Sequence, residues 1–155
     1  MDDPVKTKDE LICELTALRK RVDELEERNT RFREREEAFI DLFNATEELA
    51  FLQELNGTVV LANNCTAVFY GISREDIVGR SIYEFIFRDK IESARKRIQT
   101  VIDTQKTVRF EGTLGEKVFE NSLYPVLDRS GNVCRVAVYV RDITERKRLE
   151  EAVRQ

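Results

Sequence analysis

Apolar side chains recur along the first forty residues at alternating spacings of four and three. No Gly or Pro interrupts residues 6–43, and this 4-3 spacing is the heptad repeat of a coiled coil. The repeat places Asn29 in an otherwise apolar a column, where a buried Asn selects a parallel, in-register dimer at some cost in stability. It predicts a dimer seam formed by Leu11, Leu15, Leu18, Val22, Leu25, Asn29 and Phe32.

Charged residues beside this seam fit the same register. Glu14 faces Arg19, and Arg21 faces Glu26, across the two chains of a parallel dimer. The alternative is a lone amphipathic helix that lies on its own domain. The sustained repeat favours the homodimer.

Shorter apolar runs follow, and their boundaries predict a hairpin and two short helices. Residues 49–55 and 58–62 flank an Asn-Gly pair, which favours a tight turn between antiparallel strands. Residues 63–70 then suit a helix capped by Asn63 or Asn64 and ended by Gly71. A second short helix opens at Ser73 and ends at Gly79.

A longer amphipathic helix is expected over residues 89–104. Its apolar stripe consists of Ile91, Ala94, Ile98, Val101 and Ile102, which should pack on a sheet. Its polar positions are expected to lie mostly away from that stripe, and they are Lys90, Arg95, Lys96, Arg97 and Gln99.

The last third of the chain has the composition of strands. Residues 107–113, 117–127 and 132–141 are separated by turn-forming residues, and Pro125 requires an edge or bulge position. The total is five strands with helices between the second and third. This order predicts an α+β fold, an antiparallel sheet with helices on one face.

The hydrophobic pattern changes period at Asp142-Ile143-Thr144. Strand alternation precedes this tripeptide, and a run of Glu, Arg, Lys and Leu that favours a helix follows it. Thr144, followed by Glu145, can cap the new helix. Asp142 can cap the helix together with Thr144.

Composition narrows the function classes. The 155 residues suit one domain with an appendage, and the net charge of −4 comes from interleaved signs, which does not favour nucleic-acid binding. The chain has no His, which excludes His-based catalysis, imidazole metal ligation and histidine phosphorylation within it. We find no catalytic constellation and no metal site in the sequence.

The cysteines and the hydropathy predict a cellular location. Cys13, Cys65 and Cys134 are odd in number and far apart, which argues against a disulfide framework and favours a reducing compartment. No apolar run approaches the roughly 18 residues of a membrane span. We expect a cytoplasmic segment without membrane contact.

The full series of elements and motifs resembles the PAS sensory family, including its C-terminal PAC portion. The resemblance covers residues 37–149 and is carried by Leu55-Asn56-Gly57, Asn63, Gly71, Glu75 to Gly79-Arg80, Asp128 to Gly131, and Arg141 to Lys147. It divides the chain into an N-terminal coiled-coil helix at 1–36, a PAS sensor domain at 37–144 and the start of a C-terminal signalling helix at 145–155.

The resemblance implies a pocket between the sheet and the inserted helices, which in the family is empty or holds haem, flavin or a metabolite. Its candidate lining is almost wholly apolar: Val60, Phe69, Ile77, Ile82, Phe85, Ile86, Ile98, Phe110, Leu123, Val136 and Val138. The absence of His excludes His-ligated haem, and Ile82 stands where a photosensor of this family has its reactive cysteine. A noncovalent flavin or a small apolar ligand fits this lining, but the simpler interpretation, which we favour, is a filled core.

The resemblance also implies a role in signalling. In the pattern of the family Asp142 would hold a basic partner, which is compatible with its role in capping the helix. It predicts that Asp142, Ile143 and Thr144 pass a change in core or ligand packing to an effector domain in cis, most simply a histidine kinase of a bacterial or archaeal signalling protein. A diguanylate cyclase or a transcription effector is the alternative, as is a constitutive dimerisation spacer that senses nothing.

Overall fold

A computed structural model describes residues 5–155, which form two compact units that meet between Leu42 and Phe43. The first unit contains all but the last two residues of helix α1, Lys8–Asn44, whose 37 residues are about 55 Å long at 1.5 Å per residue. A capping box starts it. The Glu10 carboxylate accepts a hydrogen bond from the Thr7 backbone N–H at 2.7 Å, and the Thr7 hydroxyl accepts one from the Glu10 N–H at 3.3 Å. The long N-terminal helix is confirmed.

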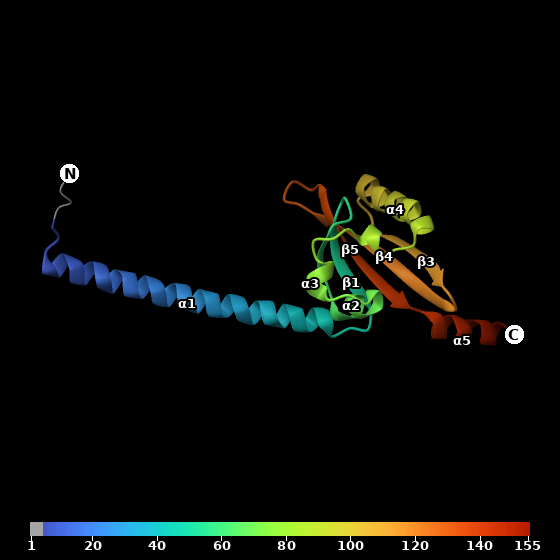
Figure 1. Ribbon diagram of the computed structural model, residues 1–155, viewed down its shortest axis with the longest axis horizontal. Coiled ribbons are helices and arrows are strands. Elements are labelled where there is room, and N and C mark those ends of the chain that lie inside the picture. The colour runs from blue at the N-terminus through green and yellow to red at the C-terminus, as the bar shows by residue number, and fades with distance from the viewer. Residues whose placement is uncertain (1–4) are drawn as a thin grey trace. The chain divides into compact units, whose positions relative to one another are not determined.

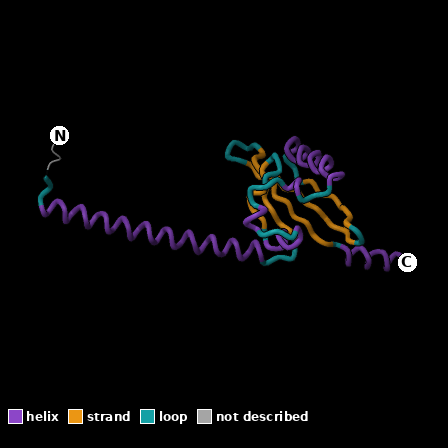
Figure 2. Tube along the Cα trace, viewed as in Figure 1, coloured by secondary structure: helices purple, strands orange, loops and turns teal. Residues whose placement is uncertain are grey.

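The second unit is built on a five-stranded antiparallel sheet with the order β2-β1-β5-β4-β3 (Figures 1 and 2). Its strands are β1 Leu49–Glu54, β2 Val59–Ala62, β3 Val108–Leu114, β4 Lys117–Leu127 and β5 Val133–Asp142. Strands β1 and β5, which are distant in sequence, pair at the centre of the sheet, so the hairpin at one end of the domain and the last strand share a ladder. The predicted α+β fold is confirmed.

The helices between β2 and β3 begin where the sequence predicts their caps. They are α2 Asn64–Tyr70, α3 Arg74–Ile77, the 3-10 turns Ile82–Glu84 and Arg88–Lys90, and α4 Ile91–Thr104. The Asn63 side chain accepts from the Thr66 N–H, and the Ser73 side chain accepts from the Asp76 N–H. Gly71 ends α2 in the left-handed conformation at φ 67°.

Helix α4 covers one face of the sheet (Figure 1). Ile98 and Val101 of its apolar stripe are buried, as the stripe predicts. The core between this helix and the sheet is mainly aliphatic, and its buried members are Phe51, Val59, Ala62, Ile77, Ile82, Ile98, Val101, Leu123, Val133, Val136 and Val138. Each fully buried aliphatic side chain of this kind contributes roughly 1.5–3 kcal/mol through the hydrophobic effect.

Pro125 meets the expectation of an edge position, near the end of β4. The pairing of β3 with β4 ends at Leu123, so β4 has only β5 as a neighbour at Pro125. A bulge follows between Val126 and Leu127. The proline therefore costs the β3–β4 ladder no hydrogen bond.

The Asn63 side chain is fully buried and joins three segments. Its carbonyl oxygen accepts hydrogen bonds from the backbone N–H groups of Ala50 and Thr66 and from the Thr66 hydroxyl. Its amide nitrogen donates to the carbonyls of Phe43 at 3.2 Å and Glu48 at 2.9 Å. One residue thus caps α2, pairs with β1 and holds the segment that enters the domain.

The turn between β1 and β2 depends on Gly57, which has a φ of 93°. A Cβ atom at this position would lie 2.5 Å from Cε2 of Tyr83, so the ring packs directly over the backbone of the turn. Both the φ angle and the close approach require Gly.

We predict that Gly57→Ala lowers the free energy of unfolding by about 2 to 4 kcal/mol, because it combines backbone strain with a steric clash. Gly115→Ala is the matched control: Gly115 has a φ of 61°, but nothing lies within 4 Å of an added Cβ. It should cost only about 1 to 2 kcal/mol. Urea unfolding followed by tyrosine fluorescence measures both, and equal losses would contradict the role of Tyr83.

Candidate ligand cavity and signalling junction

A cavity of about 380 Å³ lies between α4, the preceding turns and the sheet. A smaller cavity of about 120 Å³ adjoins it, since the two share Tyr70, Ile86, Ala94, Arg97, Phe110, Asn121 and Val140 in their linings. Open space therefore remains beside the buried core of the domain. The combined space is near the lower end of what small-molecule sites occupy.

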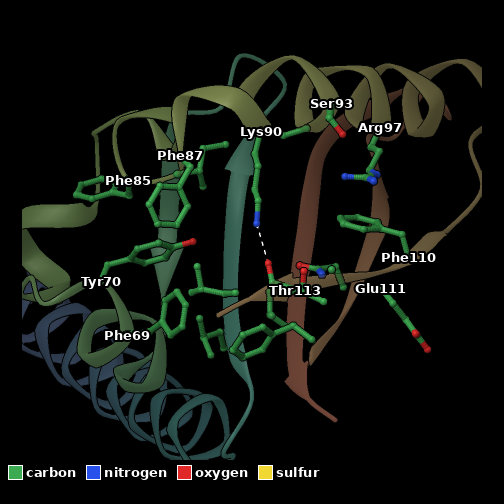
Figure 3. Close-up of a pocket in the computed structure, with 18 residues that line it drawn as sticks. Phe69, Tyr70, Phe85, Phe87, Lys90, Ser93, Arg97, Phe110, Glu111 and Thr113 are labelled. Atoms are coloured by element: carbon green, nitrogen blue, oxygen red, sulfur yellow. Dashed lines mark hydrogen bonds between the residues drawn. The ribbon is translucent and has the colours of Figure 1, made fainter. Parts of the chain in front are cut away.

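Aromatic rings form one wall of the larger cavity (Figure 3). Phe69 packs edge-on against Tyr70 at 5.0 Å and against Phe119 at 5.9 Å between ring centroids, and Tyr70 lies 5.7 Å from Phe85. Burial raises the pKa of the Tyr70 hydroxyl to about 12. This hydroxyl therefore stays protonated and remains a hydrogen-bond donor across the physiological range.

Two cations reach the cavity from the opposite side. Figure 3 shows the side chains of Lys90 and Arg97 directed toward it, and the ammonium group of Lys90 donates a hydrogen bond to the Thr113 carbonyl at 2.9 Å. The guanidinium carbon of Arg97 lies 3.5 Å from the centroid of the Phe110 ring. Within residues 5–155 neither cation forms an ion pair.

Amide side chains add polarity deeper in the site. Asn121 lines both cavities, and its side chain makes no hydrogen bond to another described residue. Gln53 lines the smaller cavity with 2% of its surface exposed, and its amide nitrogen is 3.4 Å from the Glu54 carbonyl. Both amides can bind a polar group in the cavity.

The structure brings most of the eleven predicted pocket residues to these cavities. Phe69, Phe85, Ile86 and Phe110 line the larger one, while Ile82, Ile86, Ile98, Phe110, Leu123 and Val138 line the smaller one. Ile77 and Val136 line neither and are fully buried core residues. Val60 also lines neither, because it is half-buried while its neighbour Val59 faces the core.

The expectation of an almost wholly apolar lining is wrong, because Lys90 and Arg97 both line the larger cavity. The polar positions do lie mostly away from the apolar stripe, as expected, and Arg97 is the exception. Arg97 is three residues after Ala94 and four before Val101, so it stands on their side of α4. Its stem follows the stripe while its charge rests on the Phe110 ring. The spacing of Arg97 from Ala94 and Val101 was the signal in the sequence that indicated its place on this side of the helix. Its charge favoured the opposite expectation, an exposed position.

The second candidate site is the junction between β5 and α5, Thr144–Arg154. Ile143 is 3% exposed, and its N–H donates to the Val118 carbonyl at 2.9 Å. The Val118 N–H donates in turn to the Thr144 hydroxyl oxygen at 3.0 Å. Both groups of one β4 residue therefore hold the start of the helix.

Asp142 completes the junction. One carboxylate oxygen accepts from the Thr144 N–H at 3.0 Å and from the Thr144 hydroxyl at 2.5 Å, and the other lies 3.2 Å from the ammonium group of Lys117. These contacts hold the pKa of Asp142 below its ordinary value, and the hydrogen bond from the Thr144 hydroxyl has the largest effect. Asp142, which lies just before the capping position, thus accepts from the first N–H group of the helix and also holds a basic partner.

Thr144 does not act as the cap, contrary to its expected role. The helix begins at Thr144 itself, and Ile143 occupies the capping position without a side-chain hydrogen bond. Thr144 instead bridges Asp142 and Val118 through its hydroxyl group. Its side chain therefore connects the junction to β4 and does not cap the helix.

The described part of the chain contains neither of two other kinds of site. Among residues 5–155, no three His, Cys, Asp or Glu side chains gather in a group that could hold a metal ion. No helix formed by these residues is long and apolar enough to cross a membrane.

Solved structures share this fold at low sequence identity. The PAS domain of an HTR-like protein from Haloarcula marismortui is 21% identical with a TM-score of 0.60, covering 76% of this chain and 99% of that one. A sensory box sensor histidine kinase from Vibrio cholerae is 15% identical with a TM-score of 0.54, covering 76% and 98%. The VqmA dimer of Vibrio cholerae is 21% identical with a TM-score of 0.59, covering 70% and 51%.

A family model gives the more specific result. No curated protein sequence matches the chain significantly, but the model described as PAS fold matches residues 43–148. These residues span the sheet, the inserted helices and the junction at Asp142. The match covers well over half of the 155 residues, and the chain therefore belongs to the PAS fold family.

Proposed function

We propose that this PAS signalling module passes a change in its cavity through Asp142-Ile143-Thr144 to an effector that follows α5. The observation that carries this proposal is the double role of the first residues of β4. Phe119 lines the larger cavity and pairs with Asp142 across the sheet. Lys117 and Val118, immediately before it, hold the start of α5.

The proposed relay is short and contiguous. The Phe119 ring is in contact with Phe69 inside the cavity, and Val140, two residues before Asp142, lines both cavities. A ligand that displaces the ring moves the β4 backbone, and the two hydrogen bonds of Val118 transmit that movement to Ile143 and Thr144. A strand that is itself the cavity wall needs no further transmitting element.

The effector we propose is a histidine kinase in the cytoplasm. A sensor histidine kinase is among the solved structures that share this fold, which motivates this choice. VqmA has been solved bound to DPO and is described among LuxR-type receptors, which supports a ligand-binding role and a transcription effector as the alternative. A diguanylate cyclase is equally compatible with the junction.

We further propose that the module is a homodimer through α1. Between 49% and 67% of the surface of each apolar seam residue is exposed in the single chain, and these residues are Leu11, Leu15, Leu18, Val22, Leu25 and Phe32. An apolar stripe on one face of a 37-residue helix is stabilised by pairing with a second copy. Pairing of the two α1 helices would place both junctions in one dimer.

Replacing Asn29 tests the seam. Asn29→Leu should raise the melting temperature of the helix by several degrees and broaden the distribution of oligomers, since it removes the polar a residue that selects a dimer. Thr30→Leu adds the same side chain at a b position and should change neither property. Calorimetry and multi-angle light scattering measure the two effects. A monomeric wild-type chain at high micromolar concentration would contradict the dimer.

The junction should also respond to acid. Because the pKa of Asp142 is lowered from its ordinary 3.8 in the folded state, its stabilising contribution is complete above that value and is lost as pH falls through the lowered pKa. The NMR signal of the Thr144 amide should therefore titrate with a midpoint below 3.8. Asp142→Asn should abolish this titration, and a midpoint at or above 3.8 would refute the described contacts.

Signal transmission is tested in a fusion that joins the chain, in heptad register, to the catalytic domains of a histidine kinase. Asp142→Ala and Lys117→Ala should each change basal autophosphorylation several-fold in the same direction, because each removes one side of the same ion pair. Asp103→Ala is the control, since among the described residues its carboxylate accepts only from Gln99, on the exposed side of α4. Unchanged activity in both junction variants would favour the spacer function.

A further inference from the structure

We propose that the cavity binds a small organic carboxylate with a flat apolar body, and that Arg97 holds the carboxylate group. This inference rests on the proposed sensor function and names the ligand class for its cavity. It is carried by the charge balance of the lining, by the free edge of the Arg97 guanidinium and by the aromatic wall opposite.

The lining has an excess of positive charge. Lys90 and Arg97 face the cavity without an ion-pair partner in the described part of the chain. The one acidic residue of the lining is Glu111, and its carboxylate is already paired with Lys147 at 2.9 Å. An anionic ligand is therefore attracted to this space, and an amine is repelled.

The stacking of Arg97 on Phe110 leaves its donors available. The ring covers one face of the guanidinium plane, whereas the N–H groups point outward within that plane. No described residue accepts a hydrogen bond from them. A carboxylate can thus bind the edge of Arg97 through two parallel hydrogen bonds, the geometry that this pair prefers.

Lys90 can assist this binding. Its ammonium group has three donors, of which the Thr113 carbonyl uses one. Figure 3 shows the Lys90 side chain extending from the start of α4 toward the same space. Lys90 therefore adds a second positive charge, but as a mobile point charge it selects less for carboxylate geometry.

The opposite wall determines the body of the ligand. Phe69, Tyr70 and Phe85 present ring faces and edges to about 380 Å³ of space, which favours a flat apolar group over a branched or highly polar one. The Tyr70 hydroxyl and the Asn121 amide make no hydrogen bond within residues 5–155, so they can bind a polar substituent on that body.

Isothermal titration of the full 155-residue chain with benzoate, phenylacetate and indole-3-acetate tests the proposal, with the corresponding neutral amides as matched probes. At least one acid should bind saturably and more tightly than its amide. Arg97→Gln should weaken that binding about tenfold to a hundredfold, as expected for loss of a hydrogen bond between charged groups. Arg97→Lys, which keeps the charge but loses the fork, should weaken it less.

Arg95→Gln is the matched control. Arg95 is on the same helix and its guanidinium carbon lies 4.8 Å from the centroid of the Tyr83 ring, but it lines neither cavity. Its substitution should leave the affinity unchanged while testing whether loss of a stacked cation damages the fold. Equal binding of acid and amide, no binding of any of the three acids, or full affinity in a folded Arg97→Gln variant would each overturn the proposal.

NMR spectra of the same samples separate this inference from the relay. If the acid shifts the signals of Arg97 and Asn121 but leaves those of residues 144–148 unchanged, the ligand class is correct and the relay is wrong. If no acid binds while Asp142→Ala still alters kinase activity in the fusion, the relay stands and the ligand class is wrong.

Discussion

The antiparallel ladder between β4 and β5 is the constraint on which both candidate sites depend. Its register pairs Phe119 with Asp142 and Leu123 with Val138, so that cavity wall and helix junction are fixed by the same set of backbone hydrogen bonds. A slip of one residue would turn the cavity side chains to the other face of the sheet and would separate Val118 from Thr144. The bulk of the buried Phe119 and Leu123 side chains opposes such a slip, because one face of this ladder is core.

The inner space of the domain has two unlike ends. Toward β1 and β2 it is occupied by Ile77, Val59 and Val136, whose compact aliphatic side chains are almost fully buried. Toward β3 and the start of α4 it is bounded by larger rings that meet edge to face, and several of them carry a cation on one side. Rigid rings in such contacts cannot collapse into the remaining volume, which explains why a cavity persists beside a well-packed core.

The fold could be predicted from the sequence because its decisive features are local. The Asn63 cap, the Asn-Gly turn and the change of period at Asp142 each depend on a few consecutive residues, and each occurs where expected. The polar part of the cavity was harder to predict from the sequence, because it depends on the conformations that long side chains adopt. The residues around Arg97 in the sequence do not determine whether its side chain extends into solvent or lies on Phe110. That ring belongs to a different element, β3. The Thr144 hydroxyl likewise accepts a hydrogen bond from Val118 on β4 and does not cap the helix that begins beside it.

Pro125 has a consequence for association between molecules. Beyond Leu123, β4 has no partner on the side of β3, and such an open edge can recruit a strand of another chain. The proline and the bulge at Val126 and Leu127 both make this short edge a poor template for further pairing. This stretch of β4 is thereby protected against edge-to-edge pairing with another chain, which leaves β2 and β3 as the edge strands of the sheet.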